Sequence, residues 1–125
     1  MFNSPFQTDV LKWMLKCFGP AITVDATERN RRFLEASLEL IQACGCTASE
    51  AHQLVDEVYD RPAGEPTKEV GGVMVMLAAL CIAQGIEMDE AADAELKRVW
   101  TAIEQIRAKQ ASEPRHSHLP EKDKV

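Results

Sequence analysis

A run of fourteen residues without a charged side chain, residues 70–83, constrains this sequence more than any other feature. It reads VGGVMVMLAALCIA and ends at Gln84-Gly85. A helix that is apolar on every side has no face for water, so we expect neighbouring elements to bury it. Because the run is well short of the roughly 20 residues that span a bilayer, we expect no membrane-crossing segment here.

Glu69 stands directly before this run. A carboxylate at the head of a buried helix needs a partner, because burying an unpaired charge is costly. An arginine, a helix N-terminus or a metal ion would each serve. Two more glutamates at helical spacing, Glu35 and Glu39, lie on an earlier predicted helix, which makes a metal site worth considering.

The composition is that of one soluble domain. The chain has 125 residues, a length that suits a single sizeable core, with 46% hydrophobic and 27% charged residues. A net charge of −6 argues against non-specific binding to nucleic acid or anionic lipid. The four cysteines follow no regular framework, so we expect reduced thiols in a cytoplasmic protein.

Capping residues and helix breakers divide the chain into about five helices. The first opens at Ser4-Pro5 and stops at Gly19-Pro20, the second runs from Asp25 to about Cys44, the third opens at Thr47 and runs through Tyr59, the fourth runs from Pro66 or Thr67 to Gly85, and the fifth opens at Asp89. No credible stretch alternates with a period of two. We therefore expect an all-α bundle over residues 5–111, followed by a polar, disordered tail at residues 112–125.

The acidic residues of the second helix allow two interpretations. Glu28 with Arg32, and Arg31 with Glu35, are spaced four residues apart, so a solvated face with ion pairs explains them. The fourth helix favours the other interpretation, a metal site. Gly71-Gly72 inside a helix costs roughly 2 kcal/mol relative to Ala-Ala, so a close approach of another element is expected there.

If the second helix packs against these glycines, it brings Glu35 and Glu39 near Glu69. Three carboxylates together are tolerable around a cation, and oxygen ligands are what Mg²⁺ prefers. Tight helix packing alone would also explain the glycines. A zinc site at Cys44-Gly45-Cys46 with His52 is not expected, because the spacing matches no common zinc pattern.

Two segments, RRFLEASLELIQACG and KEVGGVMVMLAALCIAQGIEMDEA, resemble the acidic helices of the all-α nucleoside triphosphate pyrophosphohydrolases, the superfamily that includes MazG-like proteins. The resemblance covers about residues 28–108. It implies Mg²⁺ as cofactor, held by acids, and hydrolysis of a nucleoside triphosphate to the monophosphate and pyrophosphate. Members of the superfamily are usually homodimers or homotetramers.

The resemblance assigns residues one by one. Glu35 and Glu39 match the first and third glutamates of the first acidic helix, and Glu69 matches the downstream glutamate. Two acids are missing, since Ala36 stands at the second glutamate and Gly72 at the downstream aspartate. Lys97 and Arg98 stand roughly where members place basic contacts to the substrate phosphates.

Two functions follow from these residues. The first is a Mg²⁺-dependent nucleotide pyrophosphohydrolase with Glu35, Glu39 and Glu69 as catalytic and metal-binding residues. The alternative is a non-catalytic helical module that binds a nucleotide or a protein, with a degenerate metal site, and Ala36 and Gly72 favour it. A plain structural bundle would leave the glycine pair to packing alone.

Overall fold

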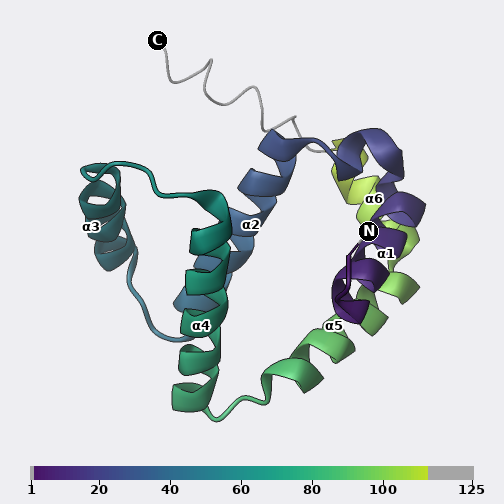
Figure 1. Cartoon of the computed structure of the whole chain (residues 1–125). Coiled ribbons are helices and arrows are strands. Elements are labelled where there is room, and N and C mark those ends of the chain that lie inside the picture. The colour runs from purple at the N-terminus through teal and green to yellow at the C-terminus, as the bar shows by residue number, and fades with distance from the viewer. Residues whose placement is uncertain (1, 113–125) are drawn as a thin grey trace. The chain divides into compact units, whose positions relative to one another are not determined.

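The computed structural model describes residues 2–112, and within them all regular secondary structure is helical, without a strand. The all-α prediction is therefore confirmed. The helices follow one another along the chain as drawn in Figure 1: α1 (Pro5–Thr23), α2 (Ala26–Ala43), α3 (Ala48–Tyr59), α4 (Pro66–Gln84), α5 (Met88–Thr101) and α6 (Ile103–Ser112). The domain limits at residues 5–111 stay a prediction, and the predicted disorder concerns residues that, apart from Ser112, lie outside the described ones.

The described part has six helices where the sequence predicts five, because a turn at Ala102 divides the last one. The Ala102 amide donates to the carbonyl of Val99 at 3.2 Å. This bond reaches back three residues, so the turn is tighter than that of an α-helix, in which it reaches back four. The Thr101 hydroxyl donates to the carbonyl of Arg98 at 2.8 Å. No glycine or proline stands at this position, so the sequence carries no local signal for the break.

The predicted caps form where the sequence places them. The Thr47 hydroxyl accepts from the Glu50 amide at 3.2 Å, and the Glu50 carboxylate accepts from the Thr47 amide at 3.0 Å, which completes the capping box of α3. At the start of α4, Glu65 is a cap that the sequence did not predict, and it accepts from two amides of the first turn. Gly85 ends α4 in the left-handed conformation, with φ at 68°.

Two compact units make up the chain, and the boundaries between them fall inside α2 and α5. One unit consists of Met1–Ala36 and Ala92–Val125, and the other of Ser37–Ala91. In the first unit, α1 and α6 lie side by side (Figure 1). The Trp13 indole donates to the carbonyl of Val99 at 3.1 Å, and the ring of Trp13 meets that of Phe18 edge to face at 5.5 Å.

The sequence predicts that the first helix ends at Gly19-Pro20, and the structure shows a break inside α1 at this point. Gly19 has φ at 79° and ψ at 171°, and a short helical turn follows it. The broken turn leaves backbone carbonyls without amide donors from the helix, and Arg107 of α6 donates to them instead. Its guanidinium donates to the carbonyl of Cys17 at 2.9 Å and to that of Lys16. A cation at the C-terminal end of a helical segment also suits the helix dipole.

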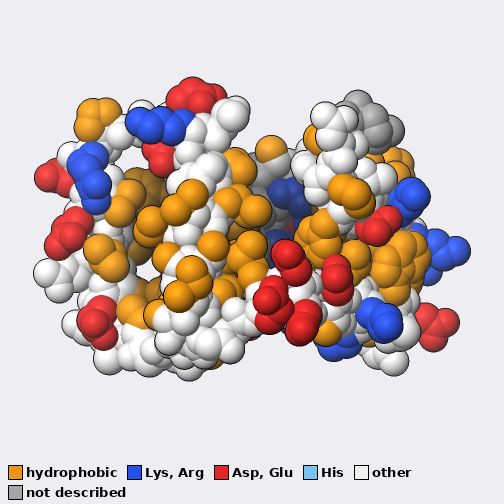
Figure 2. All heavy atoms as spheres, turned by 60° about the horizontal axis from the view of Figure 1, so that its bottom comes forward, with side chains coloured by type: hydrophobic (Ala, Val, Ile, Leu, Met, Phe, Trp, Pro, Cys, Tyr) orange, Lys and Arg blue, Asp and Glu red, His pale blue; other side chains and the backbone are white. Residues whose placement is uncertain are grey.

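The prediction that neighbouring elements bury the charge-free helix is wrong for the single chain. In α4, Cys81 is buried and Leu77 and Leu80 are half-buried, whereas Val75 is 61% and Ile82 is 81% exposed. Figure 2 shows hydrophobic side chains uncovered over this helix. The expected sizeable core is also missing, since the only buried hydrophobic residues among residues 2–112 are Cys17 and Cys81.

The length and composition of α4 also pass the test for a membrane-crossing helix, with a mean hydropathy of 1.4 over its apolar window. Core helices of soluble proteins pass the same test, but they are mostly buried, and only 6% of this window is buried within the chain. By its exposure α4 therefore differs from the core helix of a soluble protein.

Candidate functional site

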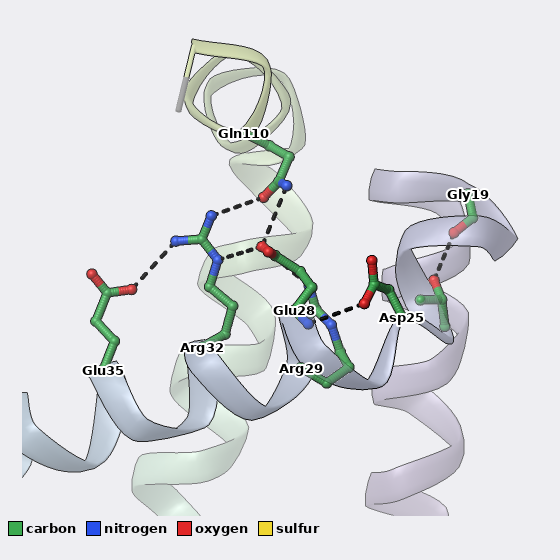
Figure 3. A network of polar contacts seen from close by, with 8 residues as sticks. Gly19, Asp25, Glu28, Arg29, Arg32, Glu35 and Gln110 are labelled. Atoms are coloured by element: carbon green, nitrogen blue, oxygen red, sulfur yellow. Dashed lines mark hydrogen bonds and ion pairs between the residues drawn. The ribbon is translucent and has the colours of Figure 1, made fainter. Parts of the chain in front are cut away.

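A buried carboxylate, Glu28, organises the start of α2 (Figure 3). It accepts from the Arg32 guanidinium at 2.8 Å and from the Gln110 side-chain amide at 3.4 Å. The Arg32 guanidinium also donates to the Gln110 carbonyl oxygen at 3.2 Å, so the three side chains close a ring. The predicted Glu28–Arg32 pair is confirmed, but it does not lie on a solvated face, because Gln110 of α6 covers it.

Arg29 borders the same network. Its guanidinium lies 4.0 Å from the Glu28 carboxylate and 5.6 Å from the centre of the Phe18 ring, over which it stacks. Burial lowers the pKa of Arg29, and the charge of Glu28 opposes that shift. Two of its nitrogens, Nε and Nη2, are buried without a hydrogen bond to any described residue. The aromatic face and the nearby carboxylate offset part of that cost.

Glu35 and Glu39 are both exposed and lie one helical turn apart on α2. Glu35 accepts from the Arg32 guanidinium at 3.3 Å, which ties it to the edge of the Glu28 network. The predicted Arg31–Glu35 pair does not occur among the described residues. Within the described part of the chain Glu39 has no ion-pair partner, so its carboxylate faces water.

Glu69 is exposed in the first turn of α4, and its side chain turns back towards the preceding loop. A Cβ added to Gly64 would lie 1.9 Å from Glu69 Oε2. Gly64 therefore leaves room for this carboxylate. No cation pairs with Glu69 among residues 2–112.

The predicted packing against the glycine pair is not found. A Cβ added to Gly71 or Gly72 would have no contact within 4 Å, so α2 does not approach the helix at this point. Around the glycines α4 is exposed on every side, since Val70, Val73 and Met74 are exposed as well.

The described residues leave the predicted magnesium site untested. Among residues 2–112 no group of three or more His, Cys, Asp or Glu side chains lies close enough to hold a metal ion. Glu35 belongs to one unit, while Glu39 and Glu69 belong to the other, so neither unit alone contains all three acids. Their assignment as metal ligands stays a prediction.

The two predicted basic contacts are exposed on α5. Arg98 makes a bidentate pair with Glu95, at 2.9 and 2.7 Å, and this pair holds the pKa of the Glu95 carboxyl below its usual range. Lys97 points its charge to solvent on the same helix. All four cysteines are free thiols, as expected, and Cys44 and Cys46 belong to no metal-binding group in the described residues.

A shallow groove of about 640 Å³ lies elsewhere, beside the break in α1. Its walls are formed by α1 and α6, with Cys17, Phe18, Arg107 and Gln110 among the lining residues. None of the predicted acids or basic contacts lines it. Arg107 is already engaged with backbone carbonyls here, so we interpret the groove as the packing boundary between α1 and α6.

Comparison with known proteins leaves the resemblance untested, because no family model, no curated protein and no solved structure matches this chain. Sequence reasoning missed two features of the structure. One is the role of Gln110, whose contact with Glu28 spans 82 residues and has no local signal. The other is the exposure of α4, which the sequence led us to expect buried.

Proposed function

We propose that this chain is a cytoplasmic nucleotide pyrophosphohydrolase of the all-α, MazG-like type, with Mg²⁺ as cofactor and a nucleoside triphosphate as substrate. One observation supports the proposal most. Glu39 and Glu69, two acids that the resemblance assigns to the metal, are exposed carboxylates without a cationic partner among residues 2–112. By contrast, the acids Glu50, Glu65 and Glu95 are engaged in caps or ion pairs.

Mg²⁺ bound to such carboxylates would supply charge stabilisation for the substrate phosphates and for an attacking water. Since no metal-binding group occurs among residues 2–112, we derive no catalytic step through the metal. Two family acids are also missing, at Ala36 and Gly72. Slow turnover is the expected consequence, because each lost ligand weakens the placement of the cation.

The full chain incubated with Mg²⁺ and a panel of nucleoside triphosphates should release pyrophosphate and the monophosphate. Glu39→Gln and Glu69→Gln should each abolish the release, because each substitution removes a charged ligand and keeps the shape of the side chain. Glu57→Gln is the matched control, since Glu57 is an exposed glutamate on α3 that the resemblance does not assign. Orthophosphate with the diphosphate as products, or full activity in both variants, would overturn the proposal.

A second function is favoured by the exposure of α4. A non-catalytic module that binds a protein or a nucleotide would need no complete acid cluster, and an apolar helix open to solvent is typical of a binding surface. If the wild-type chain releases no pyrophosphate but binds a non-hydrolysable nucleoside triphosphate in calorimetry, or forms stable complexes with protein, this second function replaces the first.

A further inference from the structure

Gly64, in the loop between α3 and α4, differs from the other five glycines of the chain. Three of those have a positive φ, a conformation that favours glycine, and the other two have open space where a side chain would begin. The φ of Gly64 is not positive, so no left-handed conformation requires glycine at this position. The reason for glycine here must lie in what surrounds it.

The space that a side chain at Gly64 would need is occupied by the Glu69 carboxylate. An added Cβ would overlap Glu69 Oε2, and it would lie 3.0 Å from Cδ and 3.4 Å from Cγ of the same residue. All three atoms belong to one flexible, exposed side chain, so Gly64→Ala would turn the carboxylate away and leave the backbone in place. Gly64 therefore decides where the Glu69 carboxylate lies.

Two of the three partners that the sequence allows for this carboxylate are not found among residues 2–112. No arginine or other cation forms an ion pair with Glu69 in this part of the chain. The amides at the start of α4 are taken, because Glu65 accepts from those of Thr67 and Lys68. A metal ion is the partner that remains for Glu69.

We propose that Gly64 positions the Glu69 carboxylate as a ligand of a divalent cation. This inference rests on the proposed function, which assigns Glu69 to Mg²⁺, and it adds a residue that acts through Glu69. Residues that orient a metal ligand typically contribute tenfold to a hundredfold to metal affinity. A side chain at position 64 would direct the carboxylate elsewhere, so the cation would lose one of its ligands.

A glycine with a purely structural role would respond differently to substitution. If Gly64 only relieved crowding in the loop, alanine would lower the stability of the fold and leave cation binding unchanged. If Gly64 acts through Glu69, alanine weakens cation binding and leaves the fold intact, because the atoms that must move belong to an exposed side chain. Cation binding and helix content therefore separate the two roles.

Electron paramagnetic resonance of Mn²⁺, titrated with the full chain, tests the inference without any turnover. Mn²⁺ takes the same oxygen ligands as Mg²⁺, and binding removes the signal of the free ion. The wild type should bind Mn²⁺, and an excess of Mg²⁺ should displace it. Gly64→Ala should weaken Mn²⁺ binding by about tenfold or more, and Glu69→Gln should weaken it at least as much.

Gly71→Ala is the matched control, since it makes the same substitution on the helix that carries Glu69, at a position with open space. It should leave the dissociation constant for Mn²⁺ unchanged. Circular dichroism should show equal helix content in Gly64→Ala and the wild type. A loss of helix content in Gly64→Ala would show a structural role and would overturn the inference.

The double variant Gly64→Ala with Glu69→Gln shows whether Gly64 acts through Glu69. The two effects on Mn²⁺ affinity should not add, because Glu69→Gln alone already removes the ligand. Additive effects, or a Gly64→Ala variant that binds Mn²⁺ as tightly as the wild type, would overturn the inference and leave the proposed function standing. A wild type that binds no Mn²⁺, or binds it no better than Glu69→Gln, would overturn the assignment of Glu69 to the metal and the inference with it.

Discussion

Replacing Glu28 by glutamine tests how much the buried network contributes to stability. The substitution keeps the shape of the side chain but removes the charge that accepts from Arg32 at 2.8 Å and from Gln110 at 3.4 Å. A hydrogen bond to a charged group contributes about 1.5–3 kcal/mol, and breaking a buried ion pair costs about 3–5 kcal/mol. The Arg32 side chain is 21% exposed, so water compensates in part for the lost ion pair. We expect a loss of about 2–3 kcal/mol.

The assay is urea unfolding at neutral pH, followed by tryptophan fluorescence. Both tryptophans, Trp13 and Trp100, lie in the unit that contains Glu28, so the signal reports on that unit even if the two units unfold separately. Glu95→Gln is the control, because the Glu95–Arg98 pair has nearly the same separation but side chains that are 61% and 60% exposed. An exposed pair contributes about 0.2–1 kcal/mol.

The difference between the two variants is the quantity that decides. If Glu28→Gln and Glu95→Gln lower the free energy of unfolding equally, burial adds nothing to the Glu28 network. That result would refute the reasoning, because it would mean that Gln110 does not exclude water from the ion pair.

Two other predictions concern the thiols and the helix caps. Alkylation followed by mass spectrometry should label Cys46 much faster than Cys17, because burial raises the pKa of the Cys17 thiol, with Arg107 opposing part of the rise, and Cys17 is only 3% exposed; equal rates would contradict the burial. Backbone amides of Thr47 and Lys68 are the leading causes that hold the pKa of Glu50 and Glu65 below the ordinary value of 4.5, so both caps stabilise the fold above that pH and are lost as the pH falls through the lowered values. Hydrogen-exchange protection factors in the first turns of α3 and α4 should fall in that acid range, and Glu50→Gln and Glu65→Gln should remove the pH step.

Local sequence signals determined the helices and their ends. The Thr47–Glu50 capping box and the stop at Gly85 depend on hydrogen bonds between residues a few positions apart, so the sequence contains all the information they need. The same holds for the all-α class, because apolar spacing and the lack of alternating stretches are local properties. The break at Ala102 escaped prediction, since no residue type marks it.

The candidate site was predictable only as far as its residue types. Sequence spacing correctly placed Glu35 and Glu39 one turn apart on α2 and Glu69 in the first turn of α4. Whether the three meet depends on contacts between distant segments, which periodicity does not encode. Nor did the spacing tell Glu28 from Glu35, although only Glu28 is buried.

Tertiary structure decided what each helix covers. Gln110 reaches Glu28 from 82 positions away and turns an expected surface pair into a buried one. The apolar character of α4 is written in the sequence, but the surface that buries it is not, because the hydrophobic effect rewards removal from water and not a particular partner. Among the described residues only Cys81 of α4 is buried, and most of the other apolar side chains of this helix stay exposed.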